Sequence, residues 1–72
     1  MEITAYIERC PETGLYAATV PSIPGAHTQG ETLEELRLNL IEVVELCLEQ
    51  MESESRENMA EFIGTQQVRV AV

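Results

Sequence analysis

Apolar and polar residues alternate at the start of the chain. Over residues 2–8 the apolar positions recur every second residue, which predicts a half-buried strand. Residues 10–14 contain Pro and Gly and predict a turn, and the apolar stretch 15–20 that follows predicts a second strand. Together they predict an antiparallel hairpin. The residues expected to face the core from the first strand are Ile3, Ala5 and Ile7.

Two prolines mark the end of the second strand. Proline cannot donate to a sheet ladder, so Pro21 ends the strand, and Pro24 followed by Gly25 fits the central positions of a type II turn. We expect residues 26–29 to return as a short third strand at an edge of the sheet.

A long amphipathic segment follows. Thr32 with Glu35 three residues later has the pattern of a capping box, and we expect a helix from there to about residue 52. The predicted buried stripe is Leu33, Leu36, Leu40, Val43, Val44, Cys47 and Met51. The opposite side carries Glu34, Glu35, Glu42, Glu45 and Glu49. Leu38 lies among these glutamates, and Leu46 also lies off the stripe.

The last part of the chain returns to a strand-like pattern. Residues 53–58 are polar and predict a connection, and residues 59–63 suit a helical turn ended by Gly64. Residues 66–72 alternate, which predicts a final strand with Val68, Val70 and Val72 on one face. A crossover through the helix would place this strand parallel to a neighbour. We therefore expect one α+β domain over residues 1–72, ordered β-β-β-α-β, like a truncated ribonuclease H fold.

Composition narrows the classes of partner. The chain has 72 residues, thirteen acidic residues, all glutamate, and four arginines, for a net charge of −9. Such a surface repels phosphate backbones, so we expect no direct nucleic-acid binding and favour a basic protein partner. The simpler interpretation is that the negative charge only keeps a small domain soluble. A chain this short buries only about 60% of its unfolded surface, which favours a homo-oligomer.

Residues suited to catalysis are sparse. His27 is the only histidine, and Cys10 and Cys47 are widely separated, so the sequence predicts no nucleophile pair, no metal site and no cofactor. The absence of Asp also argues against a degraded two-metal nuclease. The start of the chain lacks a basic segment followed by an apolar one, and no apolar run is long enough to span a membrane. We therefore expect a cytoplasmic protein that is neither an enzyme nor membrane-bound.

One stretch carries a family signature. Residues 16–42 read YAATVPSIPGAHTQGETLEELRLNLIE, which resembles the HicB-type antitoxins over about residues 3–50. The matching residues are Val20, Pro21, Pro24, Gly25, Gln29, Gly30, Glu31, Thr32, Glu34, Glu35 and Asn39. The resemblance implies a degenerate ribonuclease H-like domain that masks HicA, a small mRNA-cleaving toxin, within a type II toxin–antitoxin pair. Many relatives continue into a DNA-binding module, and residues 1–72 hold none, so autorepression is not expected.

The predicted partner-binding surface is the outer face of the helix. Its carboxylates would pair with the Arg and Lys of a basic toxin, and its one leucine would add apolar contact. The turn at residues 21–25 is a further candidate. A solvated helix face is the alternative for each glutamate, and a stand-alone self-assembling module is the alternative function. The predicted binding residues are Glu34, Leu38, Glu42, Glu45 and Glu49.

Overall fold

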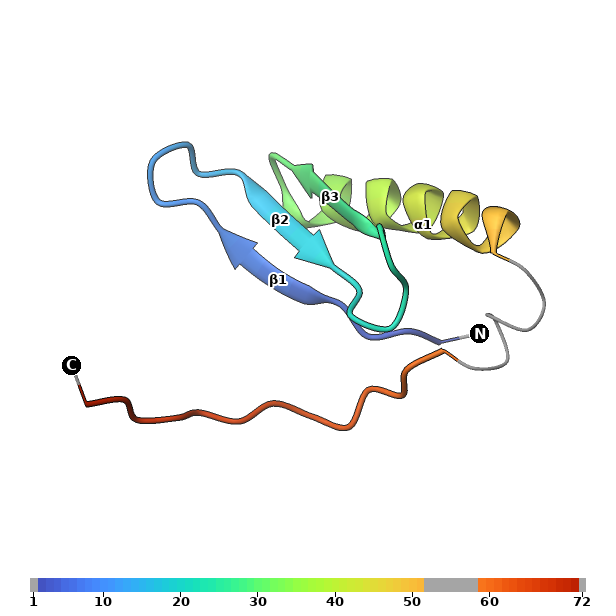
Figure 1. Cartoon of the computed structure of the whole chain (residues 1–72). Coiled ribbons are helices and arrows are strands. Elements are labelled where there is room, and N and C mark those ends of the chain that lie inside the picture. The colour runs from blue at the N-terminus through green and yellow to red at the C-terminus, as the bar shows by residue number, and fades with distance from the viewer. Residues whose placement is uncertain (1, 52–58, 72) are drawn as a thin grey trace.

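The described part of the chain forms a three-stranded antiparallel sheet followed by one helix (Figure 1). The computed structural model describes residues 2–51 and 59–71. The strands lie in the order β1-β2-β3. The α+β class expected from the sequence is confirmed. The elements are β1 (Tyr6–Arg9), β2 (Tyr16–Thr19), β3 (His27–Gly30) and α1 (Leu33–Gln50).

Both strand connections form the turns that their sequences predict. Between β1 and β2, the N–H of Gly14 donates to the carbonyl of Cys10 at 2.8 Å, and Gly14 has φ of 75°. Between β2 and β3, the N–H of Ala26 donates to the carbonyl of Ile23 at 3.1 Å, and Gly25 has φ of 82°. This geometry is the expected type II turn, with Pro24 and Gly25 at its centre.

The start of α1 differs slightly from a full capping box. The N–H of Glu35 donates to Thr32 Oγ1 at 3.0 Å, as predicted for an N-cap. The Glu35 carboxylate accepts from the N–H of Glu31 at 3.4 Å, one residue earlier than the capping-box pattern requires. The helix ends at Gln50, and residue 52, its expected end, lies outside the described residues.

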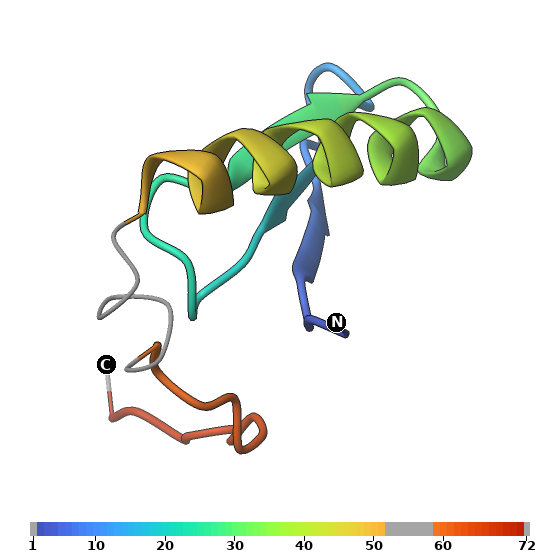
Figure 2. The ribbon, with the colours of Figure 1, turned by 90° about the vertical axis from the view of Figure 1, so that its right-hand side faces the viewer.

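The core lies between α1 and the sheet (Figure 2). α1 packs mainly on β3 and less on β2. The predicted stripe is largely confirmed: Leu36 and Val44 are buried, and Leu40, Val43, Cys47 and Met51 are half-buried. Leu33 is the exception at 56% exposed, because the sheet meets the helix at Leu36, one turn later. The fully buried residues are Ala18, Val20, Ile23, Ala26 and Leu36.

Gly30 permits a close approach between β3 and α1. A Cβ at this position would lie 2.7 Å from the backbone nitrogen of Leu36 and 3.0 Å from its Cα. No larger residue fits there unless the backbone of α1 shifts. Because Gly30 has no side chain, the start of α1 can lie directly against the end of β3.

The first strand is shorter than predicted, and its apolar face is only partly covered. It begins at Tyr6 rather than at residue 2. Ile3 and Ala5 pack against the core from the segment before it, as the alternation predicts. Ile7 is 57% exposed, so its predicted burial is wrong. The reason is that α1 covers β3 and β2 but does not extend over β1.

Residues 59–71 form neither helix nor strand, so the predicted helical turn and final strand are absent. A helical turn of five residues lacks the length to offset its nucleation cost. A strand requires a ladder partner, and both views show this segment apart from the sheet (Figures 1 and 2). The predicted connection at residues 53–58 and Val72 lie outside the described residues.

Candidate protein-binding site

The predicted binding residues form one continuous exposed stripe on α1. Their intervals of three or four residues place them on one side of the helix, opposite the core. All five are exposed, as the sequence predicts. We call this stripe the acidic helix face, and its members are Glu34, Leu38, Glu42, Glu45 and Glu49.

Leu38 is the apolar centre of the acidic helix face. It is 53% exposed and lies one helical turn from Glu34 and one from Glu42. An exposed leucine alone means little, because apolar atoms make up much of any protein surface. Its position among carboxylates gives this surface one apolar side chain with charged neighbours.

Most of the carboxylates on this face lack a basic partner. Arg37 is the single basic residue of α1, and it donates to Glu34 through Nη2 at 3.0 Å and through Nε at 3.3 Å. The hydrogen bond from Arg37 and its positive charge lower the pKa of the Glu34 carboxyl. Among the described residues, no ion pair reaches Glu42, Glu45 or Glu49. Their negative charge is therefore available to an external cation.

The opposite side of α1 fixes the orientation of this face. The Asn39 side-chain amide donates to the backbone carbonyl of Gln29 on β3 at 2.9 Å. Together with the close approach at Gly30, this bond fixes the rotation of α1 about its axis. The sequence marked Asn39 only through the family resemblance, because its partner is ten residues away and nothing local identifies it.

The turn at residues 21–25 does not join the acidic helix face. Its central residue Ile23 is 1% exposed and belongs to the same buried cluster as Val44. The turn therefore packs on the buried side of α1, opposite the glutamates. The structure brings the helix residues together and leaves the turn on the far side.

A second surface, which sequence reasoning missed, is an open apolar groove beside α1. It has a volume of about 360 Å³ and is mainly apolar. We call it the flank groove. Ile41 and Leu48 lie just outside the predicted stripe, and this widening of the apolar side is the signal that could have revealed the groove. The lining residues are Ile3, Arg37, Leu40, Ile41, Val44, Glu45 and Leu48.

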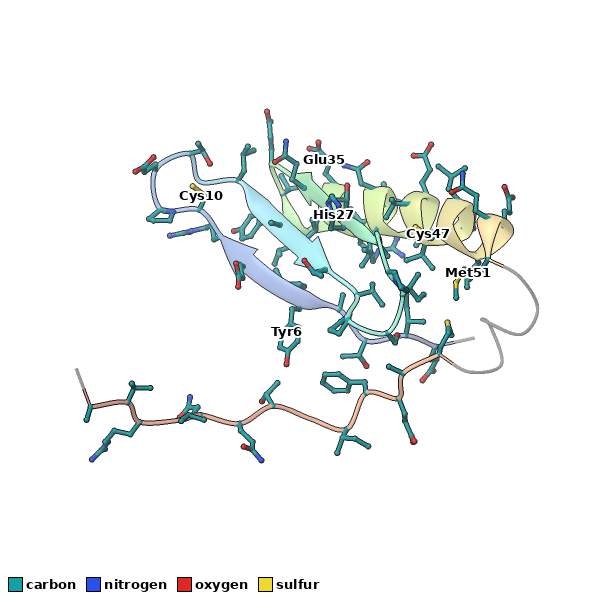
Figure 3. All side chains as sticks on the ribbon, viewed as in Figure 1. Tyr6, Cys10, His27, Glu35, Cys47 and Met51 are labelled. Atoms are coloured by element: carbon teal, nitrogen blue, oxygen red, sulfur yellow. The ribbon has the colours of Figure 1, made fainter. Side chains whose placement is uncertain are left out.

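The reactive side chains come from separate elements. Figure 3 shows Cys10 in the β1–β2 turn, His27 at the start of β3 and Cys47 on α1. Hydrogen bonds from the Thr13 side chain and from the backbone of Thr13 and Glu12 lower the pKa of the exposed Cys10 thiol. Within residues 2–51 and 59–71, no three His, Cys, Asp or Glu side chains form a metal-binding group. No helix in this part of the chain has the length and apolar character to cross a membrane.

Comparison with known proteins finds relatives over nearly the whole chain. The UPF0150 protein ssr1258 of Synechocystis is 48% identical over 69 residues, which cover 96% of this chain and 94% of the relative. The chain belongs to the UPF0150 family. A UPF0150 protein of Thermotoga maritima is 46% identical over 67 residues, covering 93% of this chain and 87% of the relative. A UPF0150 protein of Archaeoglobus fulgidus is 41% identical over 70 residues, which cover 97% of this chain and 96% of the relative.

The family name specifies no activity for this UPF0150 chain. The names of these relatives state no substrate or partner. No family model matches the chain, and no solved structure matches it. The features of this chain that bear on its function are therefore the acidic helix face, the flank groove and the resemblance in residues 16–42.

Proposed function

We propose that this UPF0150 chain is a binding protein that masks a small basic mRNA-cleaving toxin of the HicA type, as the antitoxin of a type II pair. The observation that carries the proposal is the acidic helix face: four carboxylates and a leucine on one exposed stripe. The chain performs no chemistry in this function and acts by covering the toxin's RNA-binding surface.

Charge complementarity supports a basic partner. A protein that cleaves RNA binds its substrate through Arg and Lys, and these side chains would pair with Glu42, Glu45 and Glu49, which the described residues leave without a cation. The face extends about 22 Å along the helix at 1.5 Å per residue. This length allows several contacts with one small domain. Steering by the net charge of −9 would accelerate the encounter.

Leu38 would supply the part of the interface from which water is excluded. Hot spots in protein interfaces are well-packed side chains surrounded by contacts that keep water out. Leu38 is half exposed in the free chain and would gain burial on binding. Salt would weaken the surrounding ion pairs but leave this apolar contact.

The first test is co-expression with the product of the adjacent reading frame, followed by pull-down and calorimetry at rising salt. We expect a complex with a basic partner of under about a hundred residues, and weaker binding as salt screens the ion pairs. Absence of a complex, or affinity independent of salt, would contradict the proposal.

A pair of double variants tests the location of the interface. Glu42→Arg with Glu45→Arg should weaken binding about tenfold or more, because like charges then face each other. Glu2→Arg with Glu12→Arg is the control, because both residues are exposed outside α1 and the change in net charge is equal. Equal loss of affinity in both double variants would show that only net charge matters and that this face is not the interface.

A second candidate function is a self-assembling module without a toxin partner. It is favoured by apolar side chains exposed outside α1, which are Ile7, Phe62, Ile63, Val68 and Val70. Under this alternative the chain would form oligomers, and neither the adjacent product nor a basic toxin would bind. The pull-down distinguishes the two functions.

A further inference from the structure

α1 covers the β3 side of the sheet's apolar face and leaves the β1 side uncovered. At the β3 edge, α1 packs on the strand and Asn39 binds the Gln29 carbonyl. At the β1 edge, Ile7 pairs with Ala18 across the ladder, so both side chains point to the helix side of the sheet. Ala18 is 1% exposed, whereas Ile7 is 57% exposed. The apolar layer is therefore incomplete at β1.

The flank groove continues this incomplete layer. Ile3, on the segment that leads into β1, lines the groove together with Ile41 and Leu48 of α1. An edge strand with unpaired backbone groups and an adjoining apolar surface is the usual acceptor for an added strand.

Residues 66–71 have the properties of the missing strand. Val68 and Val70 alternate with polar residues and are 74% and 66% exposed. Residues 59–71 contain one Glu and one Arg, so the segment is neutral in a chain of charge −9. A neutral segment can approach a second copy without the repulsion that the rest of the surface would cause.

The chain's own C-terminal segment does not occupy the uncovered edge. The rings of Tyr6 and Phe62 meet edge to face, with centroids 6.1 Å apart. Tyr6 alternates with Ile7 and so points away from the helix side. This contact places Phe62 beside Tyr6 on the outer face of β1, and the ribbon of residues 59–71 runs apart from the sheet in both views (Figures 1 and 2).

The surface of the single chain is too large for its mass. It exposes 6137 Å², whereas a folded monomer of 8.0 kDa exposes about 4,500 Å². Its radius of gyration is 14.1 Å, against about 11 Å for a compact chain of this length. The described residues 60–71 are all exposed and contribute to this excess.

We infer that residues 66–71 of one copy pair with β1 of a second copy, reciprocally, to form a strand-exchanged dimer. Val68 and Val70 then cover Ile7 and close the flank groove of the partner copy. The acidic helix face stays exposed, with Glu45 at its border with the groove. This inference is independent of the proposed toxin partner, since it concerns a different edge of the molecule.

Isotope-filtered NMR on an equimolar mixture of labelled and unlabelled chains tests the exchange directly. We expect intermolecular contacts from Val68 and Val70 to Ile7. Contacts only within one chain would show that the segment completes its own sheet, and intermolecular contacts at any other surface would also overturn the inference. This measurement uses the unaltered chain.

Sedimentation of two matched double variants gives the second test. Val68→Glu with Val70→Glu should convert the dimer to a monomer and raise its dissociation constant at least about a hundredfold, because charges would enter an apolar groove. Thr65→Glu with Gln67→Glu adds the same charge at exposed positions outside the valine face and should remain dimeric. A monomeric unaltered chain, or a dimer that survives the valine substitutions, contradicts the exchange.

Discussion

The two edges of the sheet differ in how completely the chain covers them. β3 is covered by α1, held by the bond from Asn39 and approached closely at Gly30. β1 has an exposed Ile7 and an open groove beside it. The difference shows that α1 covers the apolar side of β2 and β3, whereas Ile7 on β1 stays exposed.

Chain length explains the difference. An 18-residue helix is about 27 Å long and 10 Å wide with its side chains, and neighbouring strands are about 4.8 Å apart. One helix therefore covers two strands but not three. A chain of 72 residues has no second helix in its described part to cover β1. The outer side of the same helix remains exposed and carries the glutamates.

Truncation of Leu36 should give the largest loss of stability on the covered side. Leu36→Ala removes a side chain that is 1% exposed and should lower the free energy of unfolding by about 2–5 kcal/mol. In so small a domain this loss approaches the whole free energy of unfolding. Leu46→Ala, on the exposed side of the same helix, should change it by under about 0.5 kcal/mol. Urea denaturation followed by circular dichroism compares the two, and similar losses would refute the description of the core.

The close approach at Gly30 should give the next largest effect. Gly30→Ala places a methyl group against the backbone of Leu36 and should cost about 1–3 kcal/mol. Gly64→Ala is the matched control, because nothing lies within 4 Å of a Cβ built there. Denaturation midpoints measure both. A neutral Gly30→Ala would mean that α1 can move away from β3, and the covered edge would then be less rigid than described.

Loss of the helix cap should have a smaller effect. Thr32→Ala removes the oxygen that accepts from the N–H of Glu35 and should lower the free energy of unfolding by about 1 kcal/mol. Thr32→Ser keeps a hydroxyl at this position and should restore most of the stability. If Ser and Ala were equally destabilising, the methyl group rather than the hydrogen bond would be responsible.

The exposed ion pair should give the smallest effect. Arg37→Gln removes the hydrogen bond and charge that lower the pKa of Glu34, so that pKa should rise toward its ordinary value. Because the folded pKa is the lower one, any stabilisation is present above the unfolded pKa and disappears as pH falls through the folded pKa. Titration of the Glu34 carboxyl by NMR measures the shift, with Arg9→Gln as a control that should leave it unchanged. No shift with Arg37→Gln would show that the pair does not form in solution.

Local signals explain what the sequence could predict. Pro24 with Gly25 specified a type II turn, Thr32 specified the helix start, and the glutamate spacing placed the acidic helix face on one side. Each of these features depends on spacings of only a few residues along the chain. Their physical causes are backbone conformation, capping and helical periodicity. Each of these can be recognised from residue types and their spacing in the sequence.

Features that depend on distant segments could not be predicted in the same way. Alternation showed which side Ile7 faces, but the width of α1 relative to the sheet decided whether it is covered. The alternating valines indicated a strand at residues 66–71. A strand also needs a neighbouring strand to pair with, and the local sequence does not identify one. The donor–acceptor pair of Asn39 and Gln29 likewise required the packed structure.

The central claim is that the chain binds its partner through the acidic helix face. An NMR titration of the labelled chain with the purified product of the adjacent reading frame tests it most directly. We predict that the largest shift changes fall on Glu34, Leu38, Glu42, Glu45 and Glu49, with little change in the β1–β2 turn. Absence of shift changes, or changes confined to the β1 edge and residues 66–71, would contradict the claim.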